Sequence, residues 1–261
     1  LAMKGAALAT GFSPVVGILI CCIHFFSRKS TIKLIPVLPS IKKLIYSCQV
    51  GVSAFVGEIS SGVITVTFNM IILNLAGNTG VAAYGVVANT SLVAVALFNG
   101  IAQGSQPLIS RSYGRGEEQN VRSLLKMALT TALGLGVLLM IFIFFSAPAV
   151  TAVFNSEHDL QLAAYADSGL RLYFIGFLFA GINIVGTAAL SAVESVKYAF
   201  CASISRGFVA TIFFAFVLSA CFKMTGIWLA FPAAEFATMF ITLSGLLCFT
   251  KQKGGMYHAK D

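Results

Sequence analysis

Two acidic residues, Glu58 and Glu235, stand inside long apolar runs of the sequence. An ionisable group inside a membrane span is costly and is a candidate for function. On a helix that turns about 100° per residue, Glu58 shares one face with small and polar residues, namely Ser47, Gly51, Ala54, Ser61, Gly62, Thr65 and Asn69. We expect this stripe to face the interior of a bundle rather than lipid. The carboxylate could exchange a proton or hold Na⁺, or it could be a structural acid hydrogen-bonded to Ser61, Thr65 or a facing helix.

Glu235 follows Pro232 in the last apolar run and shares its face with Thr238 and Thr242. It is the second candidate for cation coupling, although a structural role is the interpretation we favour. Further candidates for the lining of a substrate cavity are polar or aromatic residues of three runs: Ser61, Thr65, Asn69, Tyr84, Asn89, Asn183 and Thr187. Asn183 could contact either a ligand or a neighbouring helix.

The chain that must position these residues is predicted to be a bundle of membrane-spanning helices. Residues 59–110 contain no Asp, Glu, Lys or Arg, and as one helix they would be about 78 Å long. A bilayer core is about 30 Å thick, so the run must fold back. The GNTG sequence at 77–80 is a turn signal. Long apolar runs with few charges therefore predict seven spans, at 5–27, 44–76, 81–110, 121–148, 167–193, 203–222 and 226–250.

The distribution of basic residues predicts the topology. Cytoplasmic loops of membrane proteins are enriched in Lys and Arg. Of the 17 basic residues, 14 lie in the C-terminal tail and in the loops between spans one and two, three and four, and five and six. This count places Lys197 and Arg206 in the loop between spans five and six. The other loops hold Lys4, Arg171 and Lys223, together with Glu157, Asp159 and Asp167. We therefore expect a cytoplasmic C-terminus and, with seven spans, an external start, which indicates a fragment that has lost upstream segments.

Composition excludes several classes of protein. Hydrophobic residues make up 58% of the 261 residues and charged residues 10%, whereas soluble domains carry about 25% charged residues. A soluble enzyme, a disordered chain and a nucleic-acid-binding protein are excluded. The three His residues have no catalytic spacing, so an enzyme is not expected, and the six Cys residues lack metal-binding or disulfide spacing. We expect no catalytic residues, no metal site and no cofactor beyond H⁺ or Na⁺ as a coupling ion.

Several segments resemble the multidrug and toxic compound extrusion (MATE) transporters. Residues 100–109 (GIAQGSQPLI) and 113–116 (YGRG) resemble the end of that family's eighth helix, and 81–85 (VAAYG) match its start. Residues 226–232 (GIWLAFP), with Glu235 after them, resemble the family's last helix, and Arg206 stands where the family often has an Arg. The resemblance covers essentially the whole chain, with the motifs in the family's order and spacing.

The resemblance implies that the seven spans are helices six to twelve of a twelve-helix transporter built from two six-helix lobes. It implies residues 1–27 as the last helix of the N-lobe, 28–43 as a cytoplasmic linker between the lobes, 44–250 as the C-lobe and 251–261 as a cytoplasmic tail. Members export drugs and organic cations through alternating access by H⁺ or Na⁺ antiport. Glu58 falls where many members carry a coupling acid. One branch of the family carries an Asp where this sequence has Ala180. The resemblance therefore implies that the coupling ion binds at Glu58 or in the missing N-lobe rather than at position 180.

The expected partners are a small drug or organic cation, the bilayer of the plasma (inner) membrane and the missing N-terminal lobe. One alternative is a flippase of lipid-linked polysaccharide or peptidoglycan precursors, which shares the superfold. Flippases tend to hold pyrophosphate with Arg or Lys, and by the span boundaries above no such residue lies deep in a span, which argues against a flippase. A membrane-embedded enzyme is the third and weakest alternative.

Overall fold

The computed structural model describes residues 11–12, 14–20, 22–23, 40–155 and 158–257. Its contacts divide the chain into two compact units, Leu1–Ile45 and Tyr46–Asp261. Of the expected first span, 5–27, the described residues are helical. The rest of that span, most of the expected linker 28–43 and the last four residues of the expected tail lie outside the described residues.

The described part of the second unit is almost entirely helical. Its elements are α2 (Ile41–Gly114, which begins in the first unit), α3 (Glu118–Phe154), α4 (Leu160–Phe174), α5 (Phe177–Ala192), α6 (Val196–Ile204), the π-helix η1 (Ser205–Val209) and α7 (Ala210–Tyr257). No strand occurs among the described residues, and the expected all-α fold class is confirmed.

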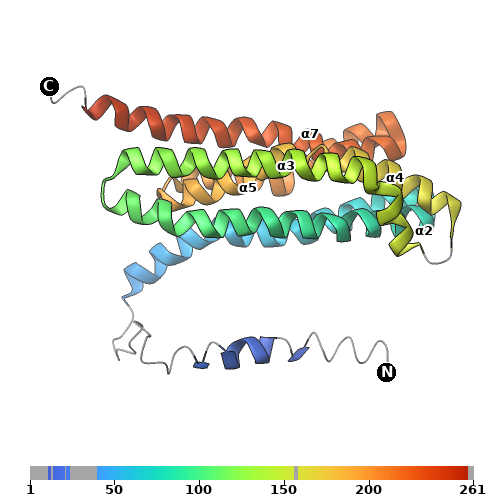
Figure 1. The fold of residues 1–261 in the computed structure, drawn as a ribbon, viewed down its shortest axis with the longest axis horizontal. Coiled ribbons are helices and arrows are strands. Elements are labelled where there is room, and N and C mark those ends of the chain that lie inside the picture. Colours follow the sequence, from blue (N-terminus) through green and yellow to red (C-terminus); the bar gives the residue numbers. More distant parts are fainter. Residues whose placement is uncertain (1–10, 13, 21, 24–39, 156–157, 258–261) are drawn as a thin grey trace. The chain divides into compact units, whose positions relative to one another are not determined.

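The two longest helices each contain a break at which the chain turns back. Gly77 in α2 has a φ of 62°, a left-handed backbone that glycine adopts without steric cost. Phe68 and Tyr84, on either side of this break, bring their ring centroids to 5.5 Å, and a side-chain hydrogen bond joins Thr65 to Tyr84. Lys223 makes the corresponding break in α7, with a φ of 53°. The turn expected at 77–80 is therefore confirmed, and the long helical segments run along the bundle (Figure 1).

Three helices of the described chain are long and apolar enough to cross a membrane: Ile59–Gly114, Glu118–Phe154 and Val196–Phe249. The pair α4–α5, bent by 49°, qualifies together as a fourth. The breaks at Gly77 and Lys223 divide the first and third of these into two, so six helical segments correspond to the six spans expected from residue 44 onward.

One boundary was wrong. The sixth span was expected at 203–222, but the helix already begins at Val196 and continues through η1. Arg206, which was counted with the loop although it falls inside the expected range, therefore lies ten residues or about 15 Å of helix beyond Val196 and not in a cytoplasmic loop. The basic count that supports the topology falls accordingly to 13 of 17, which leaves the loop bias strong.

The core of the bundle is aromatic. Trp228, 1% exposed, has its ring 6.4 Å from that of Tyr84. Tyr173 stacks on Phe231 at 4.2 Å, next to the break between α4 and α5. Gly176 lies at this break, and a Cβ there would collide with the Phe231 ring. The close approach of α7 thus requires a glycine where the fifth span bends.

Candidate functional site

A buried carboxylate, that of Glu235, organises a polar cluster inside the helix bundle. Glu235 is 1% exposed. Arg206 Nε donates to its Oε1 at 2.5 Å. Asn183 Nδ2 donates to its Oε2 at 2.7 Å and to its backbone oxygen at 2.8 Å. Both carboxylate oxygens therefore have a donor, and the charge is matched by a guanidinium, as a buried charge requires.

Two threonines one helical turn apart in α7 complete the cluster. Thr242 Oγ1 donates to Asn183 Oδ1 at 2.9 Å, which leaves the amide NH₂ of Asn183 free to face Glu235. The hydroxyls of Thr238 and Ser205 lie 3.2 Å apart. Asn183, Thr238 and Thr242 are each fully buried. The cluster thus joins α5, η1 and the second half of α7 at one depth of the bundle.

The π-helix brings Arg206 to Glu235. In η1 the N–H of Ala210 donates to Ser205 O, five residues back, and the Arg206 carbonyl accepts from the Thr211 hydroxyl. The wider turn shifts the register of the residues before it, and π-bulges occur frequently at functional sites. The Arg206 side chain is 31% exposed, against 2% for that of Glu235. The pair therefore has a buried acidic end and a partly accessible basic end.

Gly207 ties this cluster to the span that contains Glu58. A Cβ at Gly207 would collide with the Ser60 side chain, and Ser60 is itself 1% exposed. The backbone of η1 thus lies directly against α2 two residues after Glu58. The Glu58 side chain lies outside the described residues.

The stripe predicted around Glu58 does not lie inside the packed body of the described residues. Ser61, Gly62 and Thr65 are exposed and Asn69 is half-buried. The opposite face of the same segment packs inward instead, through Ser60, Phe68 and Ile72. The large apolar side chains gain more from burial than the small polar ones, so on the described helices the stripe faces outward; whether it faces a bundle interior or lipid stays a prediction.

The other predicted residues are distributed between this stripe, the core and the Glu235 cluster. Tyr84 is buried at 5% exposure and bonds Thr65. Asn89 is exposed and donates to the backbone of Gly85 in its own helix. Thr187, half-buried in α5, accepts from Ser191 through its backbone oxygen. Of the candidates whose side chains the structure describes, only Asn183 joins Glu235.

Sequence reasoning missed Arg206 as a member of the site. Arg206 lies near the start of the expected span 203–222, and it was counted with the basic residues of the loop before that span. Its partner is 29 positions away. The sequence did contain a signal for this pair. Arg206 and Glu235 lie on either side of the break at Lys223, so they belong to adjoining helical segments. A buried acid requires a matching base, and the adjoining segment is the first place to look for it.

The family model described as MatE matches residues 54–217, which is more than half of the chain. No curated protein matches the sequence well enough to count as a relative.

Solved structures share the fold at low sequence identity. One is the outward-facing conformation of a multidrug resistance MATE family transporter of the MOP superfamily, with a TM-score of 0.86 and 20% identity over 96% of this chain and 57% of that one. An inward-facing MATE family transporter of the same superfamily has a TM-score of 0.77 and 19% identity, over 96% of this chain and 58% of that one. A third structure is a MOP superfamily transporter from Pyrococcus furiosus, which is described by the reverse polarity of its binding pocket. Its TM-score is 0.82 and its identity 19%, over 95% of this chain and 56% of that one. The chain thus spans less than three fifths of the length of these transporters.

Proposed function

Since this chain belongs to the MatE family, we propose that it forms part of a secondary active transporter of the plasma (inner) membrane. In this proposal the transporter exports drugs or organic cations by alternating access, in exchange for H⁺ or Na⁺. Residues 44–250 would form the C-lobe, 1–27 the last helix of an N-lobe, 28–43 the linker and 251–261 a cytoplasmic tail. The N-lobe would complete the transporter, because alternating access requires two halves that move around one site.

The observation that carries this proposal is the exposed polar stripe of α2. Ser61 and Thr65 are exposed at the surface of a membrane helix bundle, next to exposed apolar residues such as Val66 and Met70. Polar residues within a span rarely face lipid and usually line a cavity or pack on another helix. A stripe of this kind is suited to the wall of an aqueous cavity that a second lobe would close.

The geometry of Glu235 favours Glu58 as the coupling acid. Both Glu235 oxygens already have donors, Arg206 and Asn183, so a proton or Na⁺ would have to displace a guanidinium. Glu58 shares by spacing the face of Ser61 and Thr65. In the proposed mechanism an ion and the substrate exchange at Glu58, while Glu235 and Arg206 hold α5, η1 and α7 together.

A flippase of lipid-linked precursors is the second candidate function, and Arg206 is the observation in its favour. Its guanidinium lies within a span and is 31% exposed, as a pyrophosphate-binding group would have to be. The charge is matched by Glu235 at 2.5 Å, so the pair as a whole is neutral. Export of organic cations therefore remains the proposal.

The test uses the whole transporter that contains this chain, at matched expression. Glu58→Gln should abolish most ion-driven efflux of an organic cation such as ethidium, because Gln keeps size and hydrogen bonding but loses the charge. Glu235→Gln is the matched control within the same lobe and should have a smaller effect. Normal efflux by the Glu58 variant, together with loss of efflux in the Glu235 variant, would contradict the proposal and assign the coupling role to Glu235.

A further inference from the structure

A groove lies between α3 and α4, inward from the loop that joins these two helices. Its volume is about 380 Å³, in the range of sites for small molecules. The wall is mainly apolar, and Arg171 is the one charged residue among those that the structure describes in it. Phe145 of this wall is 79% exposed and Phe144 is 53% exposed. Because these large apolar side chains are exposed in a membrane-spanning bundle, the groove faces lipid.

Two contacts hold the Arg171 side chain in the groove. Its Cζ lies 5.3 Å from the centre of the Phe144 ring, within the range of a cation–π interaction. Its Nη2 pairs with Asp167 Oδ2 at 3.3 Å, one turn earlier in α4, and the two side chains keep 38% and 31% exposure. Arg171 Nε and Asp167 Oδ1 are buried, so a ligand has to meet the guanidinium through its Nη groups and the carboxylate through Oδ2.

The depth of Arg171 matches that of a lipid headgroup. The 37 residues of α3 make a helix about 55 Å long, which extends about 12 Å beyond each side of a bilayer core about 30 Å thick if the helix is centred. Arg171 lies eleven residues after Leu160, or about 17 Å of helix from the start of α4. Helical side chains lean toward the N-terminus of their helix, which for α4 is the end nearer the membrane surface. The guanidinium therefore lies near the edge of the hydrocarbon core, where lipid phosphates begin.

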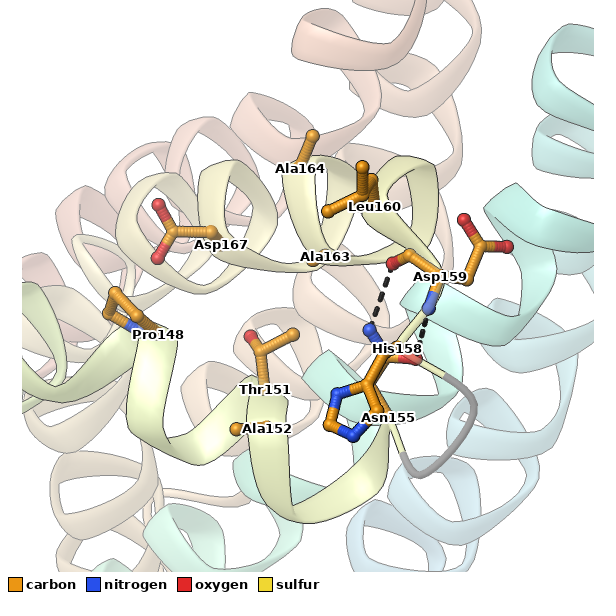
Figure 2. Close-up of a pocket in the computed structure, with 10 residues that line it drawn as sticks. All are labelled: Pro148, Thr151, Ala152, Asn155, His158, Asp159, Leu160, Ala163, Ala164 and Asp167. Atoms are coloured by element: carbon orange, nitrogen blue, oxygen red, sulfur yellow. Dashed lines mark hydrogen bonds between the residues drawn. The ribbon is translucent and has the colours of Figure 1, made fainter.

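The charges beside the groove are one cation and one anion in a fixed order. Asp167 lies one turn nearer the loop than Arg171, and the pair is neutral as a whole. His158 and Asp159 line the adjoining pocket at the start of α4, and Figure 2 shows both well apart from Asp167. The Asp159 carboxylate there accepts from the N–H groups at the start of its own helix. A zwitterionic headgroup, with its phosphate deeper than its ammonium, has the complementary order of charges.

We propose that this groove is a site for one phospholipid, phosphatidylethanolamine. Its phosphate accepts from the Nη groups of Arg171, its ammonium donates to Asp167 Oδ2, and one acyl chain lies along Ile141, Leu172 and Ile175. A choline headgroup lacks the N–H donors, and a glycerol headgroup lacks the positive charge. The inference goes beyond the proposed transport and does not depend on which acid couples the ion.

The test is native mass spectrometry of the purified 261-residue chain, released from detergent with defined lipids. Phosphatidylethanolamine, phosphatidylcholine and phosphatidylglycerol with identical acyl chains are added in turn and together. We expect one bound phosphatidylethanolamine per chain, held at least about fivefold more tightly than either of the others. Free O-phosphoethanolamine in excess should not displace it, because that molecule lacks the acyl chain.

Two charge variants should act differently on the three lipids. Arg171→Gln should weaken both phosphatidylethanolamine and phosphatidylglycerol at least about fivefold, because each has a phosphate. Asp167→Asn should weaken phosphatidylethanolamine but strengthen phosphatidylglycerol, because it removes the carboxylate that competes for Arg171. Arg115→Gln removes the cation of an exposed pair before α3 and should change neither lipid.

A third variant tests the groove without altering a charge. Ile141→Trp fills the groove and should weaken binding of phosphatidylethanolamine, whereas Leu133→Trp, at an exposed position of the same helix outside the groove, should not. Ile141 is itself 47% exposed, so this variant carries the test if a charge variant does not fold. Equal binding of the three lipids, a preference for phosphatidylglycerol, or unchanged binding in Arg171→Gln or Ile141→Trp would overturn the proposal. A dimer without bound lipid would also overturn it and would indicate that a second copy of the chain covers the groove.

Discussion

Removal of Arg206 should destabilise the bundle more than any loss of an exposed ion pair in this chain. The guanidinium donates to a carboxylate that is 2% exposed. Removing one partner of a buried pair costs about 3–5 kcal/mol, because an unpaired charge is left behind. Arg206 is 31% exposed and Asn183 remains as a donor, which lowers the expected cost of Arg206→Met to about 2–4 kcal/mol.

A double-mutant cycle isolates the pair itself. Replacing both residues, in Arg206→Met with Glu235→Met, removes both charges and leaves Asn183 bonded to the backbone oxygen of residue 235. Glu235→Met alone leaves Arg206 without its partner and should cost about 2–3 kcal/mol. The double variant should lose little more than Arg206→Met alone, so the cycle gives a coupling energy of about 2–3 kcal/mol. Reversible unfolding by SDS in mixed micelles, followed by the fluorescence of the single Trp228 in the core, measures each corner of the cycle.

The control cycle uses an exposed pair of the same residue types. Arg115 and Glu117 approach to 3.9 Å with side chains 55% and 41% exposed, and such pairs contribute about 0–1 kcal/mol. If the Arg206–Glu235 cycle gives a coupling energy no larger than this control, the buried pair does not hold the bundle together.

Three further predictions concern the cluster and the topology. Asn183→Asp replaces the amide that donates to Glu235 with a second carboxylate, so it should lower the free energy of unfolding by about 1–3 kcal/mol, and unchanged stability would contradict the contact. Gly207→Ala should destabilise the chain by about 1–3 kcal/mol through its collision with Ser60, and Ser60→Gly should restore stability. A Cys at His158, which is exposed in the loop between α3 and α4, should react with an impermeant reagent outside the cell while a Cys at Ser112 is protected; the opposite pattern would refute the charge-derived topology.

The helical framework could be predicted because the bilayer imposes its own length scale. A charge-free run of 52 residues at 59–110 is too long for one crossing, and the turn signal at Gly77 became the left-handed break of α2. The bend between α4 and α5 could not be read in the same way. It depends on the Phe231 ring against Gly176, a contact between residues 55 positions apart.

The candidate site was only partly predictable for a related reason. Glu235 was recognised by its type and its apolar surroundings, but the role of its partners depends on the π-helix and on the hairpin at Lys223. The stripe of Ser61 and Thr65 was identified correctly as a group, yet its periodicity could not say whether it faces the core of one lobe or a cavity between two.

The coupling of substrate to an ion gradient is the central claim, and reconstituted liposomes test it most directly. The whole transporter is placed in liposomes that hold a pH-sensitive or Na⁺-sensitive dye, and an organic cation such as ethidium is then added on one side. We predict that substrate entry drives H⁺ or Na⁺ out in proportion, that Glu58→Gln abolishes this exchange, and that the 261-residue chain alone shows none. Substrate movement that leaves both ion gradients unchanged, or exchange that is unaffected by Glu58→Gln, would contradict the account.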